Sequence, residues 1–311
     1  MGLVACGDPV RTPLRVGVSP WLGYEPLVLA RERKLLDPAI VRVVELESTG
    51  ESMRQLRNGR LHAAGLTLAE AIELAGSGLD IKVIALLSLS RGADAVVARA
   101  PFKTPAALAG ARIGMENSAL ADVMLQRLLS AGHLQPDDVT VVRLPVLRHE
   151  TALVQGEVDA VITFDPVLSR LATAGYNVLL DSAGMQGDVL DVLAIRTDAL
   201  LAHPAQARAL VTAFENGRRA LLAQPFDAAQ MLATGADLSS DEYLEAVDRV
   251  RFFSLEDSVR TVDALPEVPA LALQQLADDL RASHRIMNQP DWQTLFDNSA
   301  AAKALVEAVA R

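Results

Sequence analysis

The sequence predicts an α/β protein of two lobes, each built on a doubly wound sheet, joined by a two-stranded hinge. Short β-branched runs alternate with segments of helical period from residue 14 to residue 180, the pattern of βα units with mostly parallel strands. A polar break that contains a glycine, at residues 88–94, divides this pattern into two sets. The length of 311 residues suits two lobes of ordinary size better than one domain.

The first set of units runs from a strand at 14–18 to a strand at 81–86. The strands expected between them are 41–45 and 63–66, and the expected helices are 26–35, 51–58 and 70–75. Gly59 and Gly76 follow two of these helices. Glycine adopts the left-handed conformation of a helix C-terminus at little cost, so both positions indicate helix ends.

The second set lies between residues 95 and 191. Its expected strands are 95–98, one directly after Gly110, 139–144, 160–164 and 177–180, and its expected helices are 118–131, 149–154 and 166–174. A last strand at 191–195 is similar to 95–98 in composition. The chain should therefore cross between the lobes twice, near 90–98 and near 188–195, which makes the hinge.

The remainder of the chain is helical by period. Helices are expected at 203–223, 226–233, 240–250, 270–285 and 300–310. Without further strands these segments cannot build a third sheet, so the extra C-terminal helices should pack on lobe one. We therefore expect lobe one to comprise residues 14–94 and 192–311, and lobe two to comprise residues 95–191.

Charge and hydrophobicity limit the class of partner. Lys plus Arg is 29 and Asp plus Glu is 39, which gives a net charge of −10 with no dense basic run. Nucleic acid is an improbable partner, because neutralising phosphates needs a concentrated basic face. No apolar run reaches the roughly 18–20 residues of a membrane span, so we expect a soluble globular body.

Cys6, the single cysteine, lies before any periodic segment in the string LVACG at 3–7. A lone cysteine cannot form an internal disulfide. The string resembles a bacterial lipobox, in which the cysteine is lipidated and becomes the mature N-terminus. We therefore expect residues 1–13 to be a tether anchored to a membrane by lipid on Cys6. The alternative is a chance match in a cytoplasmic protein.

Candidate ligand-binding residues lie where strands meet helices, since ligands of open α/β folds bind beside the carboxyl ends of strands and helix N-termini. Lobe one supplies Trp21, Tyr24, Glu25, Ser48, Thr49, Thr67 and Glu70, and lobe two supplies Glu116, Asn117, Ser118, Glu150, Thr163 and Asp165. The hinge adds Ser88, Ser90, Asp94 and Asp191. We expect both lobes to close around a ligand with these residues.

Acidic and aromatic side chains dominate this set, and Arg91 and Arg148 are its main basic neighbours. Aromatic faces and carboxylates suit a cationic or amine-bearing ligand, or a heteroaromatic ring with exocyclic amines. Alternatives remain for single residues. Trp21 and Tyr24 could only cap the core. Glu70 and Glu116 could only favour helix starts, and Asp165 could be an N-cap.

Enzymatic signatures are missing from the sequence. There is no Gly-x-Ser-x-Gly elbow, no His-Glu-x-x-His and no P-loop. The acidic residues have no metal-ligand spacing, and His149 is expected on the solvated surface. We therefore expect no catalytic residue, no cofactor and no metal.

Four phrases carry a family resemblance by their order and spacing. They are WLGYEPL at 21–27 with ARE at 30–32, RNGRLHAA at 57–64, LAGARIG at 108–114 and VQGEVDAV at 154–161. With them the chain, over roughly residues 14–250, resembles the type II periplasmic solute-binding proteins of ABC transporters. Within these it is similar to the NMT1/THI5-like family of nitrate, taurine, alkanesulfonate and thiamine-pyrimidine binders.

The resemblance implies the type II periplasmic-binding-protein fold and a monomeric lipoprotein at the periplasmic or extracellular face that delivers a small molecule to an ABC permease. One departure concerns the ligand. A sulfonate or phosphate pocket would place Arg or Lys near the strand ends, where this sequence is largely acidic or neutral. Three alternatives stay open: a sensor for a membrane signalling receptor, an enzyme of thiamine-pyrimidine synthesis, and a sulfonate or nitrate binder.

Overall fold

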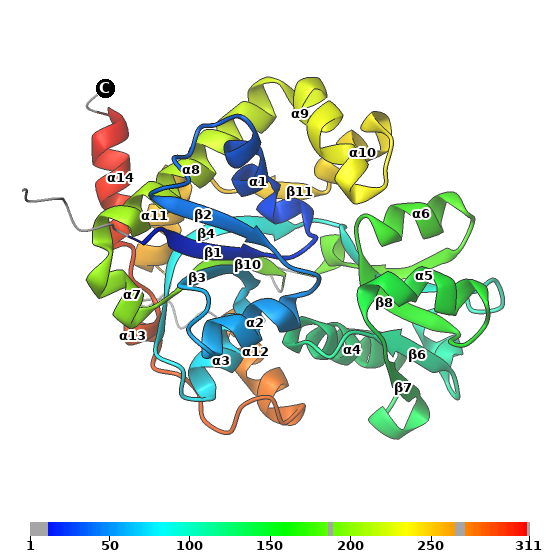
Figure 1. Ribbon diagram of the computed structural model, residues 1–311. Coiled ribbons are helices and arrows are strands. Elements are labelled where there is room, and N and C mark those ends of the chain that lie inside the picture. Colours follow the sequence, from blue (N-terminus) through cyan, green and yellow to red (C-terminus); the bar gives the residue numbers. More distant parts are fainter. Residues whose placement is uncertain (1–11, 186–188, 265–270, 310–311) are drawn as a thin grey trace, which may run out of the picture.

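The computed structural model describes residues 12–185, 189–264 and 271–309, and it contains two separate sheets (Figure 1). The six-stranded sheet of lobe one has the order β11-β4-β10-β3-β1-β2, and the five-stranded sheet of lobe two has the order β7-β6-β8-β5-β9. Lobe one uses β1 (Leu14–Val18), β2 (Val41–Glu45), β3 (Ala63–Thr67), β4 (Ile81–Ser90), β10 (Leu190–Arg196) and β11 (Val250–Phe252). Lobe two uses β5 (Asp94–Ala98), β6 (Arg112–Met115), β7 (Thr140–Arg143), β8 (Ala160–Phe164) and β9 (Asn177–Asp181).

Each sheet contains one antiparallel strand that follows a crossing between the lobes. β5 follows β4 in the chain and pairs antiparallel with β8 and β9, whereas β10 follows β9 and pairs antiparallel with β3 and β4. The other pairs around β1 and β6 are parallel. The two-lobed α/β fold expected from the sequence is thus confirmed, with both crossing strands inside the sheets.

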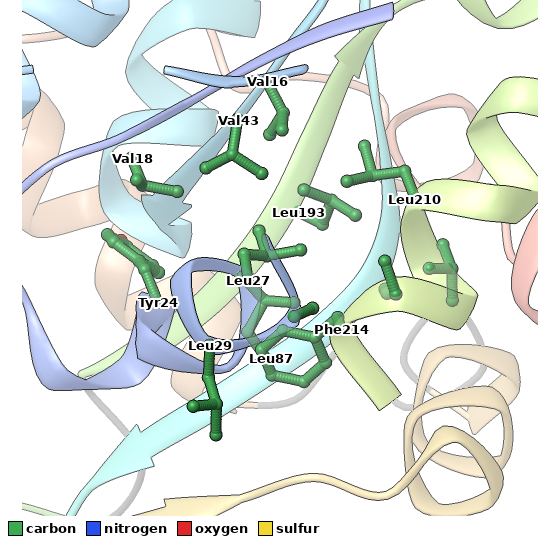
Figure 2. Packing of buried hydrophobic residues seen from close by; sticks show 14 of the residues in the cluster. Val16, Val18, Tyr24, Leu27, Leu29, Val43, Leu87, Leu193, Leu210 and Phe214 are labelled. Atoms are coloured by element: carbon green, nitrogen blue, oxygen red, sulfur yellow. The ribbon is translucent and has the colours of Figure 1, made fainter. Parts of the chain in front are cut away.

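Helices cover both faces of the sheet of lobe one (Figure 1). One face packs on α1 (Glu25–Glu32), α8 (Pro204–Ala223), α9 (Pro225–Leu232), α10 (Ser240–Val247) and α14 (Ser299–Val309). The other face packs on α2 (Thr49–Arg57), α3 (Leu68–Gly76) and α12 (Leu271–Ala282). Successive side chains of β10 pack into opposite cores, because Leu193 belongs to the first and Val192 to the second. Figure 2 shows Leu193 between α1 and α8.

Helix α1 is held close to α8, so the segment before it is fixed in place. A Cβ atom on Gly217 of α8 would lie 1.8 Å from the carbonyl oxygen of Pro26. Only glycine allows so close an approach of two backbones. The residues just before α1, from Trp21 to Tyr24, are therefore anchored to the core of lobe one.

Lobe two packs its sheet between α4 (Ala119–Gly132) on one face and α5 (Val146–Val154) and α6 (Val167–Thr173) on the other. Ala119 and Val123 of α4 also join the lobe one core beside α3 and α12. The two lobes are therefore in direct apolar contact at the start of α4. The remaining helices are α7 (Thr197–Ala202), α11 (Leu255–Ala264) and α13 (Trp292–Leu295).

Two expectations about elements are wrong. The helix expected at 240–250 ends at Val247, and Val250–Phe252 form β11, which pairs with the edge of β4. Here Arg251 alternates with apolar neighbours, a period of two that is too short to identify from sequence. The polar break expected at 88–94 is part of β4 as far as Ser90, since Ser88 and Ser90 are buried and bonded to other side chains.

None of the helices among the described residues is long and apolar enough to cross a membrane. Cys6 and the expected tether up to residue 11 lie outside the described residues.

Candidate functional site

A pocket lies between the two lobes, and we call it the deep pocket. Its lining residues come from both lobes and the hinge strands: Ser19, Trp21, Tyr24, Thr49, Thr67, Glu70, Asp94, Glu116, Ser118, Leu120, Ala121, Met124, Ile162, Thr163, Phe164, Val189 and Asp191. Its volume, taken as the space open to the centre of a water-sized sphere, is about 40 Å³. One water needs roughly 10–15 Å³ by that measure, so the deep pocket has room for about three waters or for a polar head group of that size.

The aromatic wall of the deep pocket is formed by Trp21, Tyr24 and Phe164. Trp21 and Phe164 meet edge to face with ring centroids 5.8 Å apart, across the two lobes. A 3₁₀ turn, Leu22–Tyr24, orients the first two rings, and it leaves no room for a side chain on Gly23. A Cβ atom there would lie 2.1 Å from Ser88 Oγ and 2.3 Å from Trp21 Nε1.

Asp191 holds this wall in place. Its Oδ2 accepts hydrogen bonds from Trp21 Nε1 at 2.8 Å and Ser88 Oγ at 2.6 Å, and its Oδ1 accepts one from Tyr24 Oη at 3.2 Å. Burial raises the pKa of Asp191 to about 7, although these three donors favour its ionised form. Both oxygens are already in use, so Asp191 orients the aromatic rings and is a poor candidate for the main ligand contact.

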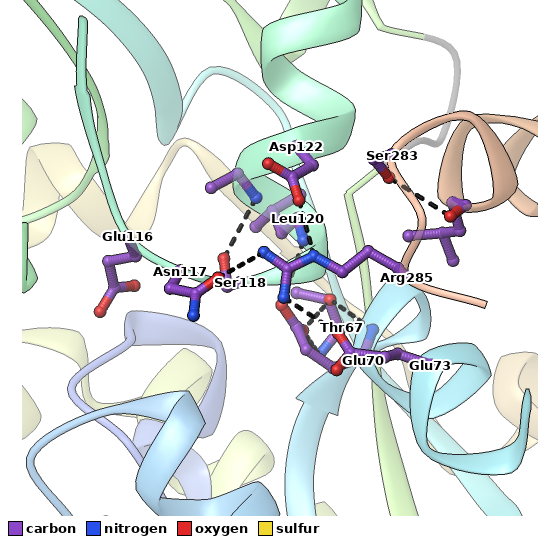
Figure 3. A network of polar contacts seen from close by, with 12 residues as sticks. Thr67, Glu70, Glu73, Glu116, Asn117, Ser118, Leu120, Asp122, Ser283 and Arg285 are labelled. Carbon is purple, nitrogen blue, oxygen red and sulfur yellow. Dashed lines mark hydrogen bonds and ion pairs between the residues drawn. The ribbon is translucent and has the colours of Figure 1, made fainter. Parts of the chain in front are cut away.

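Glu70 caps a helix and contacts the other lobe. Its Oε2 accepts hydrogen bonds from the backbone and hydroxyl of Thr67 in the capping box of α3. Its Oε1 accepts a hydrogen bond from the backbone N–H of Leu120 in lobe two at 3.3 Å. Burial raises the pKa of Glu70. The helix-start interpretation of Glu70 therefore accounts for most of its contacts, and Figure 3 shows it facing the loop 116–118.

Asp94 is the exception among the acids that line the deep pocket. The residue is 3% exposed, it lines the deep pocket, and its Oδ2 has no hydrogen-bond partner. Burial raises its pKa well above the usual value, and the carboxyl groups of Asp191, Asp165 and Glu70 raise it further, against the hydroxyl of Ser90, which lowers it. A buried, unpartnered carboxylate oxygen is costly unless something completes its bonding.

Thr163 offers only lone pairs to the deep pocket. His149 lies behind it, fully buried, with Nε2 at 3.2 Å from the carbonyl oxygen of Leu144 and Nδ1 at 3.1 Å from Thr163 Oγ1. Burial lowers the pKa of His149 to about 4, so the ring is neutral near pH 7. A carbonyl oxygen can only accept, so Nε2 is the donor and Nδ1 accepts the Thr163 proton. The expected surface position of His149 is wrong.

Glu116 is the remaining acid of the deep pocket. Burial and the nearby Glu70 raise its pKa to about 7, and the backbone N–H of Val146 opposes them. Together with Glu70, Asp94 and Asp191 it brings four carboxyl groups to the deep pocket. Among the described residues that line it there is no Lys, Arg or His.

Seven of the predicted residues lie outside the deep pocket. One is Ser88, whose hydroxyl donates to Asp191. Glu25 lies in an outer groove beside Arg31 and Glu45, and its Oε2 has no hydrogen-bond partner. Ser48 is the N-cap of α2, and Ser90 shares a 2.6 Å hydrogen bond with Ser182 Oγ. These four predictions therefore do not describe contacts of the deep pocket.

The other three are held by arginines. Asn117 Oδ1 accepts a hydrogen bond from Arg285 at 2.7 Å, and Glu150 pairs with Arg170 at 2.8 Å. Asp165, which is fully buried, pairs with Arg249 of lobe one at 2.8 Å. It therefore forms a bridge between the lobes and is not a simple N-cap.

Sequence reasoning missed several lining residues: Ser19, Leu120, Ala121, Met124, Ile162, Phe164 and Val189. Phe164 could have been predicted from the sequence, because it lies between Thr163 and Asp165 at the end of an expected strand. The apolar residues at the start of α4 gave no signal, since they have the pattern of an ordinary amphipathic helix.

The buried acids predict how stability depends on pH. Burial raises the pKa of Asp191 to about 7 and that of Glu25 to about 8, whereas unfolded carboxyl groups titrate near 4. Between pH 5 and 8 the folded state therefore binds more protons, and the free energy of unfolding falls as pH rises. A three-unit shift corresponds to on the order of 4 kcal/mol for one group.

We expect the Tm of the ligand-free protein to decline steadily from pH 5 to pH 8 when unfolding is followed by circular dichroism. Glu25→Gln is the matched control, and it should flatten the decline between pH 7 and 8 because it removes one titrating group outside the deep pocket. A midpoint that rises over this range would contradict the pKa assignments.

Comparisons with known proteins agree with the fold. The model of the NMT1-like family matches residues 7–236. The alkanesulfonate-binding protein SsuA from Xanthomonas axonopodis pv. citri, bound to MOPS, superposes with a TM-score of 0.78 at 18% identity, over 94% of this chain and 99% of that one. The ligand-binding component of an ABC-type import system from Staphylococcus aureus, with zinc bound, gives 0.77 at 15% identity over the same shares.

The desulfurization enzyme DSZB also superposes, with a TM-score of 0.70 at 16% identity, over 96% of this chain and 100% of that one. A search of curated protein sequences gives no match. At identities this low the structural similarities show a shared fold.

Proposed function

This chain belongs to the NMT1-like family, and on that premise we propose that it is an extracytoplasmic solute-binding protein of an ABC importer. In this proposal the two lobes close on a small organic ligand that is cationic or amine-bearing, including a heteroaromatic ring with amino groups. The binding proteins of similar fold support the general role, and the acidic deep pocket supports the ligand class.

The unpartnered Oδ2 of Asp94 is the observation that carries the ligand class. A ligand N–H at this atom would supply the missing hydrogen bond, and a positive charge would be attracted by all four carboxyl groups of the deep pocket. Thr163 adds a further acceptor, because its proton is donated to His149. A sulfonate or nitrate in the same place would face acceptors and negative charge, which costs energy at low dielectric.

Closure has a physical basis in the contacts between the lobes. Leu120 of lobe two donates to Glu70 of lobe one, and Asp165 of lobe two pairs with Arg249 of lobe one. Both contacts can form only when the lobes are together. A ligand that touches Asp94, Trp21 and Glu116 at once would favour this arrangement by its differential affinity for the closed state.

The membrane partners follow from the proposed role. We propose an ABC permease as the receiver of the closed form, and a lipid anchor on Cys6 that keeps a monomeric protein at the membrane surface. Replacing Cys6 with Ala in the full-length gene should release the protein from the membrane fraction without changing ligand affinity. Retention of the protein in the membrane fraction would contradict the anchor.

A thermal-shift screen tests the proposed function. Amines, aminopyrimidines, sulfonates and nitrate are added at millimolar concentration, since a ligand that binds only the folded state raises the unfolding midpoint by mass action. We expect at least one amine or aminopyrimidine to raise the Tm by several degrees. A rise with sulfonates or nitrate, together with no effect of any amine, would contradict the proposed ligand class.

A further inference from the structure

A second cavity adjoins the deep pocket, and we call it the arginine annex. Its volume, measured in the same way as that of the deep pocket, is about 440 Å³. The two cavities share Glu116 and Ser118. The N-terminus of α2 lies at the boundary, with Thr49 lining the deep pocket and Gly50 lining the annex. A ligand longer than a head group can therefore extend from one cavity into the other.

The charge of the annex is opposite to that of the deep pocket. Arg54 and Arg57 line it from α2 in lobe one, Arg143 lines it from β7 in lobe two, and Arg285 lies between the lobes. The acidic residues of its lining are Glu73 and Glu116. The two cavities thus present a negative end and a positive end to one molecule.

Internal ion pairs leave this positive charge incompletely balanced. Asp122 is shared by Arg143 and Arg285, each at 2.6 Å (Figure 3 shows the Arg285 contact). Glu73 is shared by Arg57 at 3.5 Å and Arg285 at 3.7 Å.

Arg54 pairs with Glu51 on the surface of α2. The four guanidinium groups therefore form ion pairs with three carboxylates, Glu51, Glu73 and Asp122. Glu116, the other acid of the described lining, is in none of these pairs.

The guanidinium groups of Arg54 and Arg57 are the ones best placed to take an added anion. Their side chains are 66% and 38% exposed, whereas that of Arg285 is 16% exposed and occupied by contacts that join the lobes. Arg143 is 40% exposed, but Asp122 at 2.6 Å and the carbonyl oxygen of Glu116 at 2.8 Å hold its guanidinium group. Arg54 and Arg57 both lie on α2, three residues apart, and so share one face of the helix. Arginine forks bind carboxylate, sulfonate and phosphate oxygens in the same bidentate geometry.

We infer that the ligand is amphoteric, with its amine or other cationic head group in the deep pocket and an oxyanion group in the arginine annex against Arg54 and Arg57. This inference rests on the proposed function, because it assigns the second end of the same ligand. In this arrangement the anion is bound beyond Glu116 and outside the carboxyl cluster of the deep pocket.

Three probes of one shape test the inference by isothermal titration calorimetry on the full chain at pH 7. They are benzylamine, 4-(aminomethyl)benzoate and benzoate. The wild-type protein should bind 4-(aminomethyl)benzoate about tenfold more tightly than benzylamine. In the double variant Arg54→Gln/Arg57→Gln this preference should disappear while benzylamine affinity stays within about twofold. Arg148→Gln, an exposed surface change outside the annex, is the matched control and should keep the preference.

The outcomes separate the two proposals. Suppose that benzylamine binds and that Asp94→Asn abolishes its binding. If the double variant then keeps the tenfold preference, or if the wild type shows no preference, the role of the annex is contradicted and the proposed ligand class stands. If benzoate binds best and Asp94→Asn has no effect, the proposed ligand class itself is contradicted. If none of the three probes binds, both are contradicted.

Discussion

Replacing Asp94 with Asn is expected to weaken the binding of an amine ligand at least about 100-fold, which is ~2.7 kcal/mol. The carboxylate of Asp94 is buried with one oxygen unpartnered, so a ligand N–H⁺ at that atom forms a charge-assisted hydrogen bond without water competing for it. Removing one partner of a buried charged pair typically costs 2–5 kcal/mol of binding free energy. The variant should fold about as well as the wild type, because Asn has nearly the shape of Asp and replaces a buried carboxyl group whose Oδ2 has no partner.

Calorimetry with the amine that gives the largest thermal shift measures the effect, and thermal unfolding of the ligand-free variant shows that the fold is intact. Glu150→Gln is the matched control, since Glu150 was predicted from the same sequence pattern but pairs with Arg170 outside the deep pocket. Equal losses of affinity in both variants would show that Asp94 has no special contact with the ligand.

Replacing Trp21 with Ala is expected to lower the free energy of unfolding by about 3–5 kcal/mol and to abolish binding. Trp21 is only 8% exposed and belongs to the core of lobe one, so its removal leaves a cavity. The change also deprives Asp191 of the donor Nε1, and it removes the edge-to-face partner of Phe164. The core-capping and ligand-wall interpretations of Trp21 therefore both apply.

Urea unfolding measures the loss of stability, and Trp21→Phe separates the two roles. Phe fills most of the space but cannot donate to Asp191, so it should recover more than half of the lost stability while binding stays weak. If Trp21→Ala unfolds at the same urea concentration as the wild type, the ring lies outside the core and the structural account of this wall is wrong.

The alternation of short strands and helices in the sequence predicts most of the fold. The strands 14–18, 41–45 and 160–164 have the expected limits, because β-branched runs between clear helix ends leave little ambiguity. β11 could not be found this way. Its three residues become a strand only because β4, more than 150 residues earlier in the chain, offers a free edge.

The candidate site could likewise be predicted only in part from the sequence. Asp94, Glu70 and Asp165 look equivalent in the sequence, each an acid at the end or start of an element. Only partners that are distant in the sequence distinguish them. Asp165 forms an ion pair with Arg249, and Glu70 accepts a hydrogen bond from the backbone N–H of Leu120, whereas Oδ2 of Asp94 has no partner. Which carboxylate remains open to a ligand is therefore a property of the tertiary structure.

The sign of proton exchange on binding tests the central claim most directly. The compound that binds most tightly, whatever its class, is titrated at pH 7 in buffers of different ionisation enthalpy. A positive charge in the deep pocket stabilises ionised Asp191 and Glu116, whose pKa values are both raised to about 7, so binding should release protons into the buffer. Proton uptake would mean that the deep pocket binds an anion, and it would contradict the assignment of a cationic or amine-bearing ligand.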